Sequence, residues 1–254
     1  MRRSRVLTVG SFLAFFGLCV FFGSQIFVAP QRELSSSEIQ NRLRITAQNV
    51  LSPSNNDNAD NNLRLYAVNV IHTTIPFRNP LVGYGVYLGQ GMVLTAAHIV
   101  GSVPFFTHPR VLIAGMDLPA TVIREGSKET IDLALLSVDQ SRLPYGLRLR
   151  RNPICKAALR AGADVIIVYP ERVVRSKIIS PLQIDPAYRS RFNTLINEPE
   201  GSGSGVFNGQ TNCLFGIVSK EVEKTLPGAK RTNFAGYFVP APAIIEFISK
   251  ALRL

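Results

Sequence analysis

Cysteine is scarce in this chain: the 254 residues include only three, and no two of them form a Cys-x-x-Cys pair. So few cysteines exclude a miniprotein built on disulfides and a zinc knuckle of paired cysteines. His, Cys and Asp residues nowhere have the spacing of metal ligands, so we expect no metal and no other cofactor. Heptads of apolar residues do not persist and glycine is scattered, which excludes a coiled coil and a collagen-like chain.

Acidic residues are the minority among the charges, with 17 Asp and Glu against 28 Lys and Arg and a net charge of +11. Such an excess of positive charge is compatible with binding to nucleic acid or to an anionic membrane, and also with a role in solubility alone. Apart from Arg148 to Arg151, no basic block is interleaved with aromatic residues, so we expect no nucleic-acid partner. Hydrophobic residues make up 46% of the chain, which is enough for one large β domain or two small ones.

Charge is absent from Val6 to Val28, a stretch rich in Phe and Leu. As a helix it would span roughly 35 Å, enough to cross a bilayer core of about 30 Å. Arg2, Arg3 and Arg5 precede it, so the N-terminus is expected inside and the rest of the chain outside. We predict a transmembrane anchor over residues 1–30; the alternative is a cleaved signal peptide, which would leave the protein secreted. Either way, the bulk of the protein is periplasmic or extracellular.

Residues 31–63 have the composition of a polar linker, because Leu51 to Asn62 is dominated by Asn, Asp, Ser and Pro and cannot bury a core. From residue 64 onward, short apolar runs such as Gly85 to Leu88 and Met92 to Leu94 are separated by turn residues. Several short strands between turn signals predict an all-β domain of barrels or sandwiches. After Pro240, apolar residues at helical spacing predict a C-terminal helix over 241–254.

Three residue types that together serve acyl transfer stand in suggestive settings. His98 directly follows an apolar run, Asp132 opens another, and Ser202 lies in a glycine-lined turn that leads into a third. A serine hydroxyl is a weak nucleophile until an imidazole takes its proton, and the imidazole needs a carboxylate to hold its tautomer. Glycines around the serine allow a tight turn whose backbone N–H groups face the developing oxyanion.

In this order, Thr95-Ala96-Ala97-His98, Asp132-Leu133-Ala134-Leu135 and Ser202-Gly203-Ser204-Gly205-Val206-Phe207 resemble the three motifs of the chymotrypsin-like (trypsin-like) serine proteases of compact bacterial type. The resemblance covers about residues 65–254. It implies two Greek-key six-stranded β-barrels, at about 64–145 and 146–240, with a C-terminal helix, all preceded here by the N-terminal membrane helix. It further implies a serine endopeptidase that acts on polypeptides through His98, Asp132 and Ser202.

The resemblance also implies an oxyanion hole formed by backbone N–H groups of Glu200, Gly201 and Ser202. The family usually has glycine at the position of Glu200, and Asp or Asn at the position of Gly201. A carboxylate beside the hole would oppose the oxyanion charge unless it turned away or paired with a base. A second hypothesis therefore stays open, in which the chain is a catalytically impaired pseudoprotease that serves as a binding or scaffold module in the cell envelope.

Ser204 is an alternative nucleophile. Choosing it would place Val206 and Phe207 inside the tight turn, where bulky side chains fit poorly, so we favour Ser202. By family spacing, Ile196 lies at the base of the primary specificity pocket and Ser219 on the strand that pairs with substrate backbone. An apolar base would disfavour Lys and Arg, because a buried cation without a partner is costly. Asn197 and Glu198 are close enough in sequence to reverse this preference.

Cys155 and Cys213 lie on either side of the serine motif. In an oxidising compartment they could form a disulfide, which would contribute about 2 to 4 kcal/mol; two free thiols are the alternative. The sequence contains no signal from which the oligomeric state follows.

Overall fold

The structure is a computed structural model that describes residues 62–72, 80–101, 108–127, 129–156, 160–180, 182, 193–196, 201–224 and 233–252. The anchor predicted over residues 1–30 and nearly all of the linker predicted over residues 31–63 lie outside these residues. Within the described part, helices are all too short or too polar to cross a membrane.

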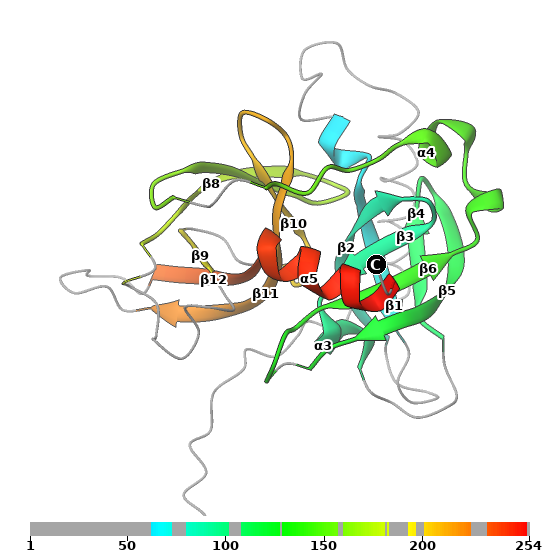
Figure 1. The fold of residues 1–254 in the computed structure, drawn as a ribbon, viewed down its shortest axis with the longest axis horizontal. Coiled ribbons are helices and arrows are strands. Elements are labelled where there is room, and N and C mark those ends of the chain that lie inside the picture. The colour runs from blue at the N-terminus through cyan, green and yellow to red at the C-terminus, as the bar shows by residue number, and fades with distance from the viewer. Residues whose placement is uncertain are drawn as a thin grey trace, which may run out of the picture.

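Six antiparallel strands close into a first barrel, in the spatial order β1-β2-β3-β6-β5-β4 (Figure 1). The strands are β1 (Ala67–His72), β2 (Leu81–Gly89), β3 (Met92–Thr95), β4 (Arg110–Ile113), β5 (Met116–Glu125) and β6 (Ala134–Val138). Because β4 returns to pair with β1 after three successive strands, the order 4-1-2-3 of a Greek key is present.

The second barrel repeats this order with the next six strands, since β7-β8-β9 is followed by β12, β11 and β10. Its strands are β7 (Asp164–Val168), β8 (Val173–Ile178), β9 (Asn193–Ile196), β10 (Gly205–Asn208), β11 (Leu214–Lys224) and β12 (Asn233–Pro240). The contact between β8 and β9 is short, with two residue pairs. The predicted all-β class is confirmed.

Short helices complete the described fold. They include α3 (Ala97–Val100), the 3-10 turn η1 (Gln140–Arg142), α4 (Tyr145–Leu149) and α5 (Ala241–Leu252), and a helical turn at residues 62–64 precedes β1. The predicted C-terminal helix is α5, drawn in red in Figure 1, where it begins beside β11 and β12 and extends toward the first barrel. Its Phe247 is buried. Arg124 of β5 holds the helix there, because its guanidinium lies 4.7 Å from the ring centroid of Phe247 and donates to the Phe247 carbonyl oxygen at 3.2 Å.

The strands form because alternate residues are apolar and face a core. Val68 and Val70 of β1 belong to the apolar cluster of the first barrel, which contains no residue of the second. A further cluster joins both barrels, with Val86 from β2, Ile217 from β11 and Phe247 from α5. The two barrels therefore share buried apolar surface, which fixes their relative position and hence any site that both contribute to.

The turn between β2 and β3 is a tight hairpin formed by Gly89, Gln90 and Gly91. All three residues have positive φ angles, of 103°, 55° and 76°. A Cβ atom on Gly89 would lie 2.5 Å from the carbonyl oxygen of Arg150, and one on Gly91 would lie 2.5 Å from that of Val138. Close backbone approach as well as conformation therefore requires glycine at both ends of the turn.

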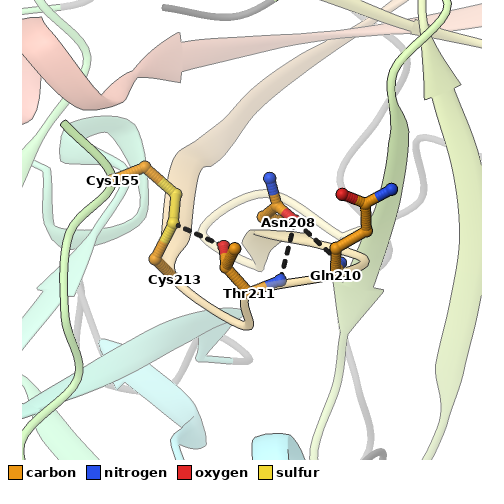
Figure 2. The surroundings of a disulfide bond; sticks show 5 residues. All are labelled: Cys155, Asn208, Gln210, Thr211 and Cys213. Atoms are coloured by element: carbon orange, nitrogen blue, oxygen red, sulfur yellow. Dashed lines mark hydrogen bonds between the residues drawn. A yellow bond between two sulfur atoms is a disulfide. The ribbon is translucent and has the colours of Figure 1, made fainter. Parts of the chain in front are cut away.

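Cys155 and Cys213 form a disulfide, with Cα atoms 5.1 Å apart (Figure 2). Cys155 lies in the segment between the barrels, and Cys213 directly precedes β11. The turn before Cys213 is stabilised by Asn208, whose side-chain oxygen accepts hydrogen bonds from the N–H groups of Gln210 at 2.7 Å and Thr211 at 2.9 Å. The disulfide thus ties the connection between the barrels to the start of β11, the strand that carries Ser219.

Candidate active site

His98 and Asp132 form a direct pair. His98 is the second residue of α3, and its side chain is 15% exposed. Its ring Nδ1–H donates to Oδ2 of Asp132 at 2.7 Å, and its backbone N–H donates to Oδ1 at 3.0 Å. Because an ionised carboxylate can only accept, Nδ1 carries the hydrogen, and Nε2 of a neutral imidazole is left as an acceptor.

The register of two strands brings this pair together. In the antiparallel pairing of β3 and β6, Thr95 lies opposite Ala134. The chain that leaves β3 toward His98 and the chain that enters β6 from Asp132 therefore lie at the same end of the barrel. Ahead of Asp132, the backbone of Gly126 approaches this segment closely. Its N–H donates to the carbonyl oxygen of Leu133 at 2.8 Å, and an added Cβ would lie 2.1 Å from the carbonyl oxygen of Ile131.

Asp132 has no exposed surface, and its carboxylate has three hydrogen-bond donors. Besides the two from His98, the hydroxyl of Ser219 donates to Oδ2 at 2.6 Å. Burial raises the pKa of Asp132, but the hydrogen bonds from His98 and Ser219 and the charge of the imidazolium together outweigh burial and hold the pKa below its ordinary value. The carboxylate is therefore ionised at neutral pH and fixes the imidazole ring.

Ser202 stands between two glycines in the turn that precedes β10. Gly201 has a φ of 141° and Gly203 a φ of 87°. A Cβ on Gly203 would lie 1.9 Å from the carbonyl oxygen of Tyr84, and one on Gly201 would lie 2.4 Å from a ring carbon of Tyr169. Both positions need glycine for conformation and for space, as the predicted tight turn around the serine requires.

Tyr84 of β2 holds this turn from the first barrel. Its backbone N–H donates to the carbonyl oxygen of Ser202 at 2.9 Å, and its own carbonyl oxygen accepts from the hydroxyl of Thr95 at 2.5 Å. Its phenol hydroxyl donates to Oε1 of Glu171 at 2.8 Å, and its ring meets that of Tyr169 edge to face at 5.0 Å. Tyr84 is absent from the candidates that the sequence suggests, since a backbone amide has no signature in the residue types.

The hydroxyl of Ser202 donates to the carbonyl oxygen of Ser219 at 3.3 Å. Ser219 in turn donates to Asp132, and Asp132 accepts from His98. Ser219 therefore contacts Ser202 through its carbonyl oxygen and Asp132 through its hydroxyl, and it lies between Ser202 and the pair of Asp132 and His98. Within the described residues, no hydrogen bond joins the Ser202 hydroxyl directly to the imidazole. The sequence indicates Ser219 as a substrate-strand residue, and its hydroxyl has this additional contact.

Ser204 differs from Ser202 in access. Its side chain is fully buried, whereas Ser202 is partly exposed. Its hydroxyl lies under the turn, where it would be 2.9 Å from a Cβ on Gly201, and it has no hydrogen-bond partner among the described residues. A buried hydroxyl cannot meet a polypeptide substrate, so this geometry speaks against the alternative nucleophile.

Other predicted site residues are described only in part. Glu200 lies outside the described residues, while the N–H groups of Gly201 and Ser202 donate to no group within them. Ile196 is on β9, opposite Ala235 of β12, and its side chain is outside what the structure describes. The predicted oxyanion hole and pocket base thus remain predictions. In the described part of the chain, His, Cys, Asp and Glu do not gather in groups of three that could hold a metal ion.

The sequence model of the trypsin-like peptidase domain matches residues 83–217, just over half of the chain. This range includes His98, Asp132 and Ser202. No curated protein matches the chain in sequence.

Several solved structures of proteases are similar to this chain in fold. Their sequence identity to it is low, so the similarity concerns the fold alone. The active form of the Rv3671c protease from M. tuberculosis aligns with a TM-score of 0.55 and 16% identity over 97% of this chain and 94% of that chain. A serine endoprotease from Yersinia pestis aligns with a TM-score of 0.54 and 21% identity over 80% of this chain and 68% of that one. The HtrA-type protease AlgW, solved with a tripeptide, aligns with a TM-score of 0.55 and 18% identity over 74% of this chain and 60% of that chain. The chain therefore belongs to the trypsin-like peptidase family of chymotrypsin-like serine proteases.

Proposed function

We propose that this chain is a serine endopeptidase in which Ser202, His98 and Asp132 form the catalytic triad. The Ser202 oxygen attacks the carbonyl carbon of a peptide bond while Nε2 of His98 takes the hydroxyl proton. The imidazolium gives that proton to the departing amine, which leaves an ester between Ser202 and the acyl part of the substrate. Water then attacks the ester, with His98 again accepting and returning a proton. Asp132 keeps Nδ1 protonated and stabilises the imidazolium.

The position of Ser219, which contacts both Ser202 and the pair of Asp132 and His98, is the observation that carries this proposal. Residues far apart in sequence and from both barrels meet there, and the donor on Nδ1 leaves Nε2 free to act as a base. The Ser202 hydroxyl needs only to exchange the carbonyl oxygen of Ser219 for Nε2 as its acceptor. In this proposal, the exchange occurs when substrate binds, and the Ser219 carbonyl then faces the substrate backbone.

The oxyanion hole in this proposal consists of backbone N–H groups. Those of Gly201 and Ser202 are suited to it, because neither is used by another group of the described residues. The amide of Glu200 is the third candidate. A pocket with Ile196 at its base would accept small or apolar side chains in preference to Lys or Arg.

We place the enzyme outside the cytoplasm, tethered by the apolar stretch from Val6 to Val28. The arginines before that stretch support this orientation. The disulfide between Cys155 and Cys213 also supports it, because disulfides persist in oxidising compartments and are rare in the cytosol. If the stretch is cleaved instead, the same domain is secreted.

The second candidate function is a pseudoprotease that binds polypeptides without cleaving them. The hydrogen bond from Ser202 to the carbonyl of Ser219, rather than to the imidazole, favours this candidate. Glu200 at a position where the family has glycine favours it too.

Labelling with a fluorophosphonate probe decides between the two candidates. A protease labels at Ser202, and Ser202→Ala and His98→Ala abolish the label. Ser204→Ala is the matched control and should label like the unsubstituted chain, because its hydroxyl is buried and unpaired. A folded chain that neither labels nor cleaves casein would establish the pseudoprotease, and labelling that persists in Ser202→Ala would refute the assignment of the nucleophile.

A further inference from the structure

A group of residues around α4 combines positive charge with exposed apolar side chains. We call it the α4 patch, and it consists of Arg142, Tyr145, Arg148, Leu149, Arg150 and Arg151. Tyr145 is 69% exposed and Leu149 is 61% exposed. Being four residues apart in one helical turn, they lie on the same face, while Leu147 between them is buried in the core of the first barrel.

The charge of the α4 patch has one sign. From Gln140 to Ala163 the sequence contains no Asp or Glu. Among the described residues, none of the four arginines forms an ion pair with a carboxylate. Asp139, the nearest acid in sequence, is occupied by Ser141, whose N–H and hydroxyl donate to it at 2.9 Å and 2.7 Å.

The arginines are held in place by aromatic rings and carbonyl groups instead. The Arg148 guanidinium lies 5.6 Å from the ring centroid of Tyr145, and that of Arg150 lies 5.7 Å from that of Tyr66. Arg151 donates to the carbonyl oxygens of Arg148 and Arg150, both at 2.7 Å. These contacts order Arg148, Arg150 and Arg151 without pairing their charge with a carboxylate. Arg142 differs, because its charge adds to the hydrogen bonds from Ser141 that lower the pKa of Asp139.

The α4 patch lies where the chain enters the domain. Tyr66, just before β1, contacts Arg150 through its ring, and its hydroxyl donates to the carbonyl oxygen of Arg151 at 3.1 Å. The segment that precedes Tyr66 leads back to the proposed anchor. A linker of that length has a root-mean-square reach of roughly 30 Å if it behaves as a flexible coil, so the patch stays close to the bilayer.

We infer that the α4 patch docks on the anionic surface of the membrane in which the chain is anchored. Arginines beside an exposed tyrosine and leucine form the combination that binds at lipid headgroups, with charge facing anionic lipid and apolar side chains entering the interface. A nucleic acid would use the charge but would leave Leu149 in water. This inference rests on the proposed tethering, which keeps a weak surface contact at high local concentration.

The test uses a fluorophore at the patch, because the chain contains no tryptophan. Full-length Tyr145→Trp is reconstituted into vesicles of phosphatidylcholine, alone or with phosphatidylglycerol, in which the acyl chains carry bromine as a quencher. We expect blue-shifted, quenched emission in the anionic vesicles only, lost when Arg142→Gln and Arg150→Gln are added or when salt is raised. Leu182→Trp is the control, since Leu182 is 78% exposed and follows β8 of the other barrel, and it should not be quenched.

Flotation of the same vesicles separates this inference from the tethering it rests on. A chain that floats while the Tyr145→Trp emission stays unquenched is anchored, and the docking inference is then wrong. A chain that does not float refutes the tether, while quenching by added anionic vesicles still decides whether the patch binds lipid. Equal quenching in neutral and anionic vesicles, or a response to DNA or heparin but not to vesicles, would also overturn the inference.

Discussion

The two halves of the candidate site are held by different kinds of contact. On the side of the first barrel, Asp132 is buried and its carboxylate accepts three hydrogen bonds from His98 and Ser219. On the side of the second barrel, the turn with Ser202 is held by backbone hydrogen bonds and by the close approach of Gly203 to Tyr84. The first half depends on side-chain chemistry and the second on backbone shape, so substitutions in them should fail in different ways.

Among substitutions that keep both Ser202 and His98, Asp132→Asn should have the largest effect on catalysis. The amide can donate, so it no longer forces the hydrogen of the His98 imidazole onto Nδ1, and the base loses its tautomer. We expect kcat to fall by about four orders of magnitude. Hydrolysis of a peptide substrate measures this loss, and thermal unfolding reports whether the fold is retained.

Asp117→Asn is the matched control for this substitution. Asp117 pairs with Arg110 at 2.8 Å, but both side chains are largely exposed, and the pair lies away from the site on β4 and β5. The control should leave kcat unchanged. If Asp132→Asn retained more than a tenth of the original kcat, the carboxylate would not be the orienting group, and the triad would have to be reassigned.

Gly203→Ala should disrupt the half of the site that contains Ser202, because the turn there depends on a backbone shape that requires glycine. The new Cβ would lie 1.9 Å from the carbonyl oxygen of Tyr84, at a φ of 87° that non-glycine residues rarely adopt. We expect the free energy of unfolding to fall by about 3 kcal/mol, from backbone strain and overpacking together. Chemical denaturation measures the change, and fluorophosphonate labelling shows whether Ser202 is still presented.

Gly146→Ala is the control for Gly203→Ala, because it makes the same substitution at a glycine that has open space around it. Gly146 lies in α4 with no atom within 4 Å of its added Cβ. Alanine there should leave stability unchanged or raise it by up to about 1 kcal/mol through helix propensity. Equal stability of Gly203→Ala and Gly146→Ala would show that the Ser202 turn adapts to a side chain and does not depend on the backbone shape of glycine.

The parts of the site that could be predicted are those with a signature in residue type. His98, Asp132 and Ser202 each stand next to an apolar strand or between glycines, so their order along the chain is readable. The β2–β3 hairpin is readable for the same reason, because Gly89 and Gly91 flank a single residue. The register of β3 and β6, in which Thr95 lies opposite Ala134, then brings His98 and Asp132 together although they are distant in sequence.

Other features depend on tertiary contacts and leave little trace in the sequence. In β8 an inward position is taken by Ser176, which hides the alternation of apolar residues, and β9 has four residues and is defined by its pairing with β12. The bond from Ser219 to Asp132 arises at an irregularity of β11, where the pairing with β12 shifts between Val218 and Lys220. No pattern of residue types encodes such a shift.

Ser219→Ala tests how much of the first half depends on this third donor. Without the hydroxyl, the pKa of Asp132 should rise toward its ordinary value, because one of the hydrogen bonds that hold it down is gone. Asp132 stays ionised at neutral pH in this variant, but its carboxylate is held by one hydrogen bond fewer and positions the imidazole less firmly. We therefore expect kcat at neutral pH to fall by about tenfold, corresponding to roughly 1.4 kcal/mol. The measurement is kcat and the unfolding free energy as functions of pH.

The sign of the pH effect follows from the lowered pKa. A carboxyl whose pKa is lower in the folded state contributes stability above its unfolded pKa of about 3.9, and this contribution disappears as pH falls through the folded value. In Ser219→Ala the folded pKa lies closer to the unfolded one, so the contribution is smaller and acid removes it at a higher pH. Identical acid limbs in the variant and the original chain would contradict a role for Ser219 in holding Asp132 ionised.

Tyr84→Phe should have the smallest effect and should separate the two roles of Tyr84. The variant loses the hydrogen bond to Glu171 but keeps the backbone N–H that donates to Ser202. We expect the free energy of unfolding to fall by about 1 kcal/mol, as for a partly buried hydrogen bond, with kcat changed by less than about threefold. Tyr145→Phe, on an exposed ring, should change neither. If kcat of Tyr84→Phe instead fell far more than its stability, the phenol would itself position the Ser202 turn, and the second half of the site would depend on side-chain chemistry after all.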